Sequence, residues 1–140
     1  TPKTSSAASD VYKRQSWDIA PPPIQKESEH LSKFSPLNNG IPAERIPACE
    51  SLKNTYERVV PFYEKEIKKS LALNKSILIS AHGNSLRALC KFLLNISEKK
   101  ISELEIPTGN PLIISFDKNL NIEKNYYLDS SRAKNIIFNQ

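Results

Sequence analysis

His82, Gly83 and Asn84 form the stretch of this sequence whose residue types and order could do chemistry. They follow "SILISA", residues 76–81, a short β-branched apolar run that is typical of a strand buried on both faces. Ligands bind beyond the carboxyl ends of strands in an open α/β sheet, and the free N–H groups that begin the next helix favour an anion. The sequence therefore predicts a phosphate site, where His82 donates a hydrogen bond to a phosphoryl oxygen or moves a proton.

The neighbours of His82 bear on this interpretation. Gly83 allows a sharp turn and a close approach to a ligand, while Asn84 and Ser85 are suited to open a helix. On pattern alone, a hydrogen-bonded structural histidine is an equal alternative at the end of a strand. The glycine, the asparagine and the helix start together favour the functional interpretation.

The elements that must position this triplet follow from apolar periodicity. Helical spacing predicts a long helix over residues 50–69, bent at Pro61, and shorter helices over 86–94 and 97–104. The run over 112–116 predicts a second buried strand, and 122–128 predicts a third strand, at a sheet edge. The proline-rich stretch 17–47 predicts a long surface loop of the kind that covers a site. This order predicts the α/β class, with crossovers between strands.

Composition narrows the function classes. The 140 residues are 39% hydrophobic and 25% charged, with a net charge of +5, which fits one globular domain. The lysines alternate with glutamates instead of clustering with aromatic residues, so we expect no nucleic-acid partner. No apolar run is long enough for a membrane span or a secretory signal, and we expect a cytoplasmic protein without a membrane partner. Cys49 and Cys90 lie outside any zinc-ligand pattern and are expected to be reduced thiols.

Four segments carry a resemblance to a known family. "ILISAHGNSLRALCKFL", with "ELEIPTGNPLIISFD" downstream and "SWDIAPPP" and "PACESLKNTYERVVPFYEKEI" upstream, resembles the 2,3-bisphosphoglycerate-dependent phosphoglycerate mutases of the histidine phosphatase superfamily. The resemblance extends from Ser16 to Leu128. It implies a three-layer α/β/α fold and, for the whole enzyme, interconversion of 3-phosphoglycerate and 2-phosphoglycerate in glycolysis.

The resemblance also implies roles for particular residues and groups. His82 corresponds to the second active-site histidine, which stabilises charge on the transferring phosphoryl group, and Gly83 and Asn84 correspond to substrate-binding residues. The family uses 2,3-bisphosphoglycerate as primer, needs no metal, and can form homodimers. Arg14 takes the place of one of two substrate-binding arginines, and Gln15 stands where the second would be.

The sequence departs from the family at its nucleophile. The family places this histidine in an "RHG" motif on an N-terminal strand, and no such motif occurs here. His30 is expected to be structural or solvent-exposed. We therefore expect an incomplete fold that lacks this strand, and a chain that is inactive alone.

The extent of the resemblance suggests how the chain is divided. Residues 1–15 resemble a spurious leader from assembled environmental reads, so we expect a truncated gene product with a mutase-like domain over 16–128 and a tail over 129–140. Among other polar residues, Arg58, Arg87 and Lys91 are expected on solvated helix faces, and Glu50 and Ser51 at a helix cap.

Two alternative functions stay open. One is a phosphatase of the same superfamily that acts on other phosphoesters. The other is a phosphate-binding module without catalysis.

Overall fold

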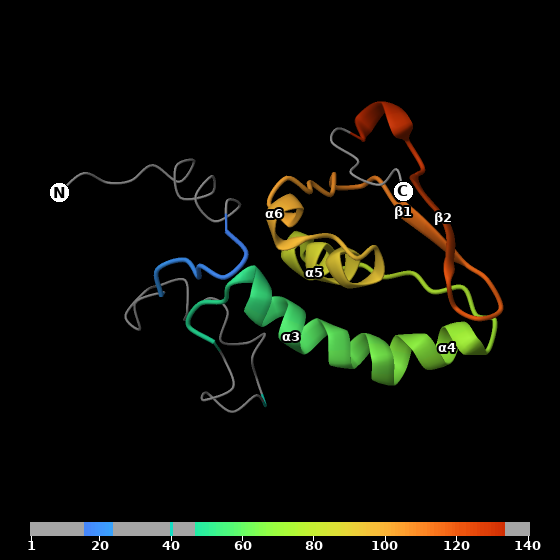
Figure 1. Ribbon diagram of the computed structural model, residues 1–140, viewed down its shortest axis with the longest axis horizontal. Coiled ribbons are helices and arrows are strands. Elements are labelled where there is room, and N and C mark those ends of the chain that lie inside the picture. The colour runs from blue at the N-terminus through green and yellow to red at the C-terminus, as the bar shows by residue number, and fades with distance from the viewer. Residues whose placement is uncertain (1–15, 24–39, 41–46, 134–140) are drawn as a thin grey trace.

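The computed structural model describes residues 16–23, 40 and 47–133 of the chain. Its helical elements are α3 (Leu52–Phe62), the π-helix η3 (Tyr63–Ile67), α4 (Lys68–Ala72), α5 (Gly83–Leu93), α6 (Glu98–Ile101) and the 3₁₀ helix η4 (Ser130–Arg132). Two strands, β1 (Leu112–Phe116) and β2 (Ile122–Tyr127), lie between α6 and η4 (Figure 1). Arg14, His30 and the segment 1–15 lie outside the described residues, as does most of the predicted loop over 17–47.

The long predicted helix is present as α3, η3 and α4 in succession, and it begins at a well-formed cap. The Ser51 side chain accepts from the backbone N–H of Asn54, and the Asn54 side chain accepts from the backbone N–H of Ser51, a reciprocal capping box. Pro61 lies inside α3 and cannot donate to the helical ladder. Two residues after the proline, the hydrogen bonding changes to the π register over Tyr63–Ile67.

The core lies between α3, α5 and α6. Figure 1 shows α5 beside α3, with α6 next to α5. The buried side chains that form the core cluster come from these helices and the loops after them: Leu52, Ala88, Cys90, Ile96, Ile101 and Leu104. An aromatic row extends the packing, because Tyr56 meets Trp17 and Phe92 edge to face, and Phe92 meets Tyr63 likewise.

Both strands predicted after the helices are present, but β1 is only partly buried along its length, and the two strands pair with each other directly, without a crossover. β1 and β2 are antiparallel, with Leu112 opposite Tyr127 and Ile114 opposite Asn125. The Asp117 carboxylate accepts from the backbone N–H groups of Asn119 and Asn121, which closes the turn between the strands. Within the described residues β2 has β1 as its only partner, as expected of an edge strand.

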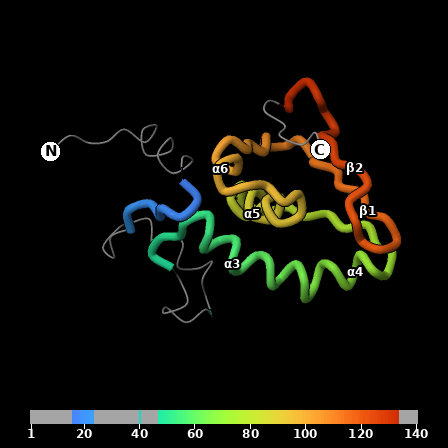
Figure 2. The backbone as a smooth tube through the Cα atoms, viewed as in Figure 1, coloured from blue at the N-terminus to red at the C-terminus, as the bar shows by residue number. Residues whose placement is uncertain are grey.

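The strand predicted over 76–81 is not formed, and this prediction is wrong. The segment runs without regular structure from α4 back to α5, as the tube in Figure 2 shows. Leu78 is 89% exposed, and Ile77 and Ile79 are each 38% exposed. A strand buried on both faces requires neighbouring strands, and the described residues supply none beside this segment. The mixture of helices with one small sheet is what an incomplete α/β fold would leave.

The two shorter helices agree with prediction apart from their ends. Ser97 caps α6 by accepting from the backbone N–H of Lys100, with Glu98 in the first turn, although the helix ends at Ile101 and not near residue 104. The helix predicted to open at Asn84 and Ser85, with its apolar positions over 86–94, begins one residue earlier, at Gly83, with His82 as its N-cap. The residue singled out for chemistry is therefore also the residue that starts α5.

Candidate active site

His82 caps α5 through its ring. Its backbone is extended, with φ −60° and ψ 144°, and its Nδ1 atom accepts a hydrogen bond from the backbone N–H of Asn84 at 3.3 Å. When Nδ1 accepts, a neutral imidazole carries its proton on Nε2. Because His82 is exposed, this Nε2–H group can donate to a ligand at the start of the helix.

The first turn of α5 is electrostatically suited to an anion. It contains no acidic residue, and the helix dipole gives it a positive end. Gly83 does not have a left-handed backbone, and a Cβ built on it would meet no heavy atom within 4 Å. Gly83 is the first helical residue after the extended backbone of His82, and the space beside it is open to a ligand.

Arg87 is buried, so the prediction that it lies on a solvated face is wrong. Its exposed fraction is 8%, and its Nη2 donates to the backbone carbonyl of Ile101, in α6, at 2.6 Å. Its Nη1 donates to Oδ1 of Asn84 at 3.3 Å. The guanidinium thus links a predicted substrate-binding residue to the next helix.

Lys91 likewise does not extend freely into solvent. Its Nζ donates to the carbonyl of Ile96 at 2.7 Å and lies 4.6 Å from the ring centroid of Trp17, a cation–π contact. The contact draws the segment around Trp17 against α5 and covers part of the lysine stem. Arg87 and Lys91 are one helical turn apart, and each donates to a backbone carbonyl outside α5.

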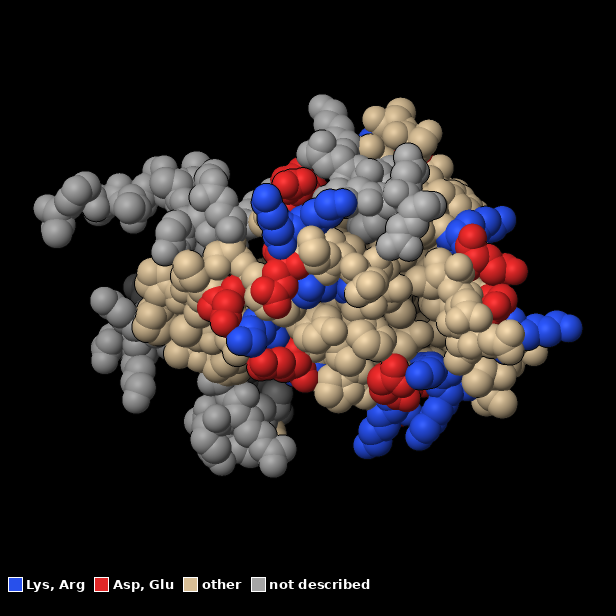
Figure 3. Space-filling view, in the orientation of Figure 1, with Lys and Arg blue, Asp and Glu red and all other residues tan. Residues whose placement is uncertain are grey.

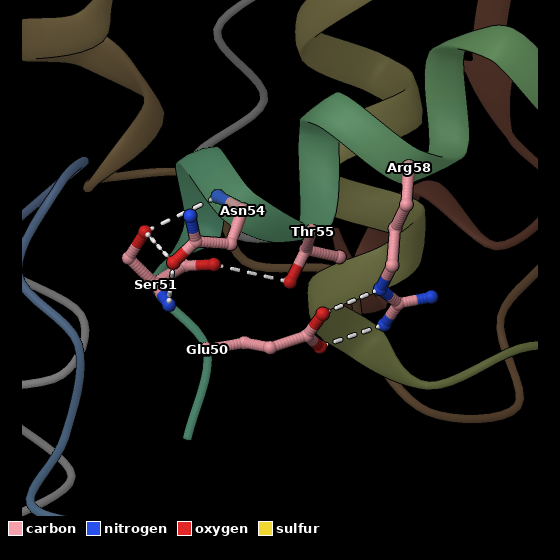
Figure 4. A network of polar contacts seen from close by, with 5 residues as sticks. All are labelled: Glu50, Ser51, Asn54, Thr55 and Arg58. Atoms are coloured by element: carbon pink, nitrogen blue, oxygen red, sulfur yellow. Dashed lines mark hydrogen bonds and ion pairs between the residues drawn. The ribbon is translucent and has the colours of Figure 1, made fainter. Parts of the chain in front are cut away.

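The start of α3 carries a second polar network, which Figure 4 shows around Glu50 and Ser51. Arg58 donates through Nε and Nη2 to the two carboxylate oxygens of Glu50, at 2.7 and 2.9 Å. This bond raises the pKa of Arg58. The Ser51 carbonyl also accepts from the Thr55 hydroxyl. The cap expected at Ser51 is confirmed, whereas Glu50 does not cap the helix and instead pairs with Arg58, which is therefore more than a solvated residue.

The loop within "IPTG" is anchored to η4 by contacts that sequence reasoning missed. Arg132 donates to the carbonyl of Thr108 at 2.8 Å and to that of Gly109, which has a φ of +68°, at 3.4 Å. Asn110 exchanges two hydrogen bonds with the backbone of Asp129. The Ser131 hydroxyl lowers the pKa of Asp129 by donating to its carboxylate. These contacts fix the loop that joins α6 to β1.

The wider surface and the remaining side chains add little to the site. On the face in Figure 3, Lys and Arg side chains alternate with Asp and Glu, without a large patch of one sign. Among the described residues there is no group of three or more His, Cys, Asp or Glu side chains that could hold a metal ion. No helix in the described part of the chain is long and apolar enough to cross a membrane.

Comparison with known proteins decides the family. The sequence profile of the histidine phosphatase superfamily (branch 1) matches residues 21–127. The chain belongs to the histidine phosphatase superfamily. The matched region includes α3, α5 and both strands, so its α/β class is shown, in the incomplete form described above.

Three curated relatives of this chain carry the same name. The chain is 51% identical over 124 residues to a 2,3-bisphosphoglycerate-dependent phosphoglycerate mutase of Pelagibacter ubique, covering 89% of this chain and 52% of the relative. Mutases of the same name from Pasteurella multocida and Treponema denticola are 44% and 43% identical, over 82% and 90% of this chain and 51% of each relative. The resemblance carried by the four sequence segments is confirmed. The chain spans about half the length of these curated relatives.

The structure places three of the four predicted site residues together. His82, Gly83 and Asn84 form the cap and first residues of α5, while Arg14 lies outside the described residues. Arg87 is the residue that sequence reasoning missed. Its spacing gave a signal, because it is three residues before Cys90 and seven before Leu94, on the side of the helix that packs inward.

Proposed function

We propose that this chain is part of a 2,3-bisphosphoglycerate-dependent phosphoglycerate mutase, and that the whole enzyme interconverts 3-phosphoglycerate and 2-phosphoglycerate in glycolysis. The observation that carries the proposal is the exposed imidazole of His82 at the N-terminus of α5, in a chain similar to curated mutases of that name. The proposal assigns 2,3-bisphosphoglycerate as the primer and requires no metal.

Phosphoryl transfer depends on positioning and on stabilising the charge of the equatorial oxygens. In the proposed role, Nε2–H of His82 donates to one of these oxygens while Nδ1 stays bonded to Asn84. The backbone N–H of Gly83 and the side-chain amide of Asn84 supply further donors. The absence of acidic residues from the first turn leaves the positive end of the helix dipole unopposed.

One part of the proposal concerns a group that this chain does not supply. The nucleophilic histidine of the family belongs to an "RHG" motif that is absent from the sequence, so the proposal includes inactivity of the 140-residue chain alone. Substrate binding by Arg14, a domain over 16–128 flanked by a leader and a tail, a homodimeric whole enzyme and a cytoplasmic location remain predictions.

The test joins residues 16–140 to the N-terminal half of the Pelagibacter ubique relative that this chain does not match. Conversion of 3-phosphoglycerate to 2-phosphoglycerate is followed with 2,3-bisphosphoglycerate present, for the joined protein, its His82→Ala variant and the chain alone. We expect activity only in the joined protein with His82 intact.

Other results would favour the alternatives. Hydrolysis of assorted phosphoesters without mutase turnover would indicate a phosphatase of the superfamily. A joined protein that folds, binds 3-phosphoglycerate and does neither reaction would indicate a binding module. Turnover by the chain alone would overturn the claim that the missing histidine is indispensable.

A further inference from the structure

Asn84 is held at two points, one on its backbone and one on its side chain. Its backbone N–H donates to Nδ1 of His82, and its Oδ1 accepts from Nη1 of Arg87, both at 3.3 Å. His82 and Asn84 are exposed, whereas Arg87 is buried. The buried guanidinium therefore lies beneath an exposed pair of residues at the start of α5.

The bond from Arg87 determines which end of the amide is available. A guanidinium can only donate, so it selects the oxygen of the Asn84 side chain and not its nitrogen. With Oδ1 engaged, the two N–H groups of Nδ2 are directed to other partners, and these groups are donors that an anion requires. The opposite amide orientation would present an oxygen to the anion and repel it.

Arginine is suited to this task in a way that lysine is not. Its planar fork donates in two directions at once, to Asn84 on its own helix and to the Ile101 carbonyl in α6 at 2.6 Å. The second bond ties the guanidinium to the core, since Ile101 is fully buried. The orientation of the Asn84 amide is thus coupled to the packing of α6 on α5.

From these contacts we propose that Arg87 is a positioning residue, which holds Asn84 so that its side-chain N–H groups donate to the phosphoryl group of the substrate beside His82. This inference rests on the proposed function, because that function supplies the phosphorylated substrate. Arg87 itself does not touch the substrate and acts through Asn84.

A ligand-free measurement tests the positioning by itself. The side-chain amide order of Asn84 is measured by ¹⁵N relaxation in the full 140-residue chain, in Arg87→Met and in Lys91→Met. Lys91 is the matched control, because it also lies on α5 and also donates to a backbone carbonyl, that of Ile96. We expect the order of the amide to fall in Arg87→Met and to stay unchanged in Lys91→Met.

Titration with inorganic phosphate and with 3-phosphoglycerate tests the consequence. In Arg87→Met the Asn84 amide no longer donates reliably to the anion, and loss of one donor to a charged group should weaken binding about tenfold. Lys91→Met should bind as tightly as the unaltered chain, even where it loses as much thermal stability as Arg87→Met. If Arg87→Met does not fold, Arg87→Lys keeps the charge and the stem but offers one ammonium for two acceptors, and it should show the same losses. Asn84→Asp keeps an acceptor for Arg87 but removes the donors, so it should fold and fail to bind phosphate.

The outcomes separate the two proposals. An amide that stays equally ordered without Arg87, or binding that falls equally in Arg87→Met and Lys91→Met, overturns the positioning role. Binding of phosphate by Asn84→Asp as tight as that of the unaltered chain overturns it too. An amide disordered only in the Arg87 variants, in a chain that binds neither ligand, supports the hold on Asn84 and overturns the phosphate site of the proposed function.

Discussion

Nδ1 of His82 accepts the backbone N–H of Asn84, so one imidazole both starts α5 and presents its other nitrogen to solvent. The two roles can be separated, because asparagine is among the best N-cap residues but has no imidazole. In the joined protein described above, His82→Asn should keep the thermal stability and lose mutase activity. His82→Ala should lose activity and also about 1 kcal/mol of stability, since alanine offers no cap.

Thermal melts and turnover of 3-phosphoglycerate, measured on the same two variants, check this prediction. Full activity in His82→Asn would show that the ring serves only as a cap, which is the structural alternative left open by the sequence. Equal stability losses in both variants would show that the cap depends on the ring geometry.

The capping box at Ser51 makes a prediction about α3. Ser51→Ala removes the acceptor for the Asn54 backbone N–H, and this should lower the free energy of unfolding by about 1 kcal/mol. Ser70→Ala is the control, because Ser70 lies in α4 and its exposed hydroxyl donates to the Glu66 carbonyl at 3.4 Å without capping a helix. Urea unfolding of the two variants measures the difference, and similar midpoints would contradict the role assigned to the cap.

The sequence predicted those features that depend on local chemistry. Ser51 and Ser97 cap helices because the hydroxyl of a residue just before a helix can accept from the free N–H groups of its first turn. This contact depends only on the local order of residues. Both predicted strands formed, and they pair as a hairpin, because they follow each other directly in the chain and Asp117 closes the turn between them. Such elements need little from the remainder of the protein.

The features that were not predicted depend on distant partners. The apolar run 76–81 has the composition of an inner strand, but a strand forms only beside others, and the described residues place none there. The spacing of Arg87 places it on the inward side of α5, but the carbonyl that satisfies its buried guanidinium belongs to Ile101 in the next helix, and the pattern of a single helix does not reveal that partner. At the candidate site, the sequence could therefore identify His82, Gly83 and Asn84 as a triplet but not the residue beneath them.

Burial of the Cys90 thiol predicts selective chemistry at the two cysteines. Cys90 lies in the core cluster, whereas Cys49 is partly exposed. A thiol reagent should therefore modify Cys49 readily in the folded chain and Cys90 only after urea is added. Mass spectrometry after peptide digestion identifies the labelled residue, and rapid labelling of Cys90 without urea would show that the core between α3 and α5 opens easily.

The same burial gives a pH dependence of stability. Desolvation raises the pKa of Cys90 from 9.0 to about 12. Below pH 9 the thiol is protonated in both states, whereas between pH 9 and 12 the unfolded chain releases its proton first and is favoured. The free energy of unfolding should therefore fall across this range. Tyr127, whose pKa burial raises to about 12, acts in the same direction, so the contribution of Cys90 is the difference from Cys90→Ala. Parallel pH profiles for the two proteins would contradict it.

The exposed segment at 77–79 predicts that the chain associates. Its three apolar side chains face solvent, and a stretch of strand composition without a partner can pair with another chain. Leu78→Lys should shift the 140-residue chain toward monomer in light scattering measured over a range of concentrations. Leu73→Lys is the matched control, because Leu73 is 68% exposed but lies at the end of α4, outside the segment. Equal effects of the two lysines would mean that added charge, and not the unpartnered segment, governs association. A monomer with a sharp cooperative thermal transition before any substitution would show that the chain tolerates this exposed surface without a partner.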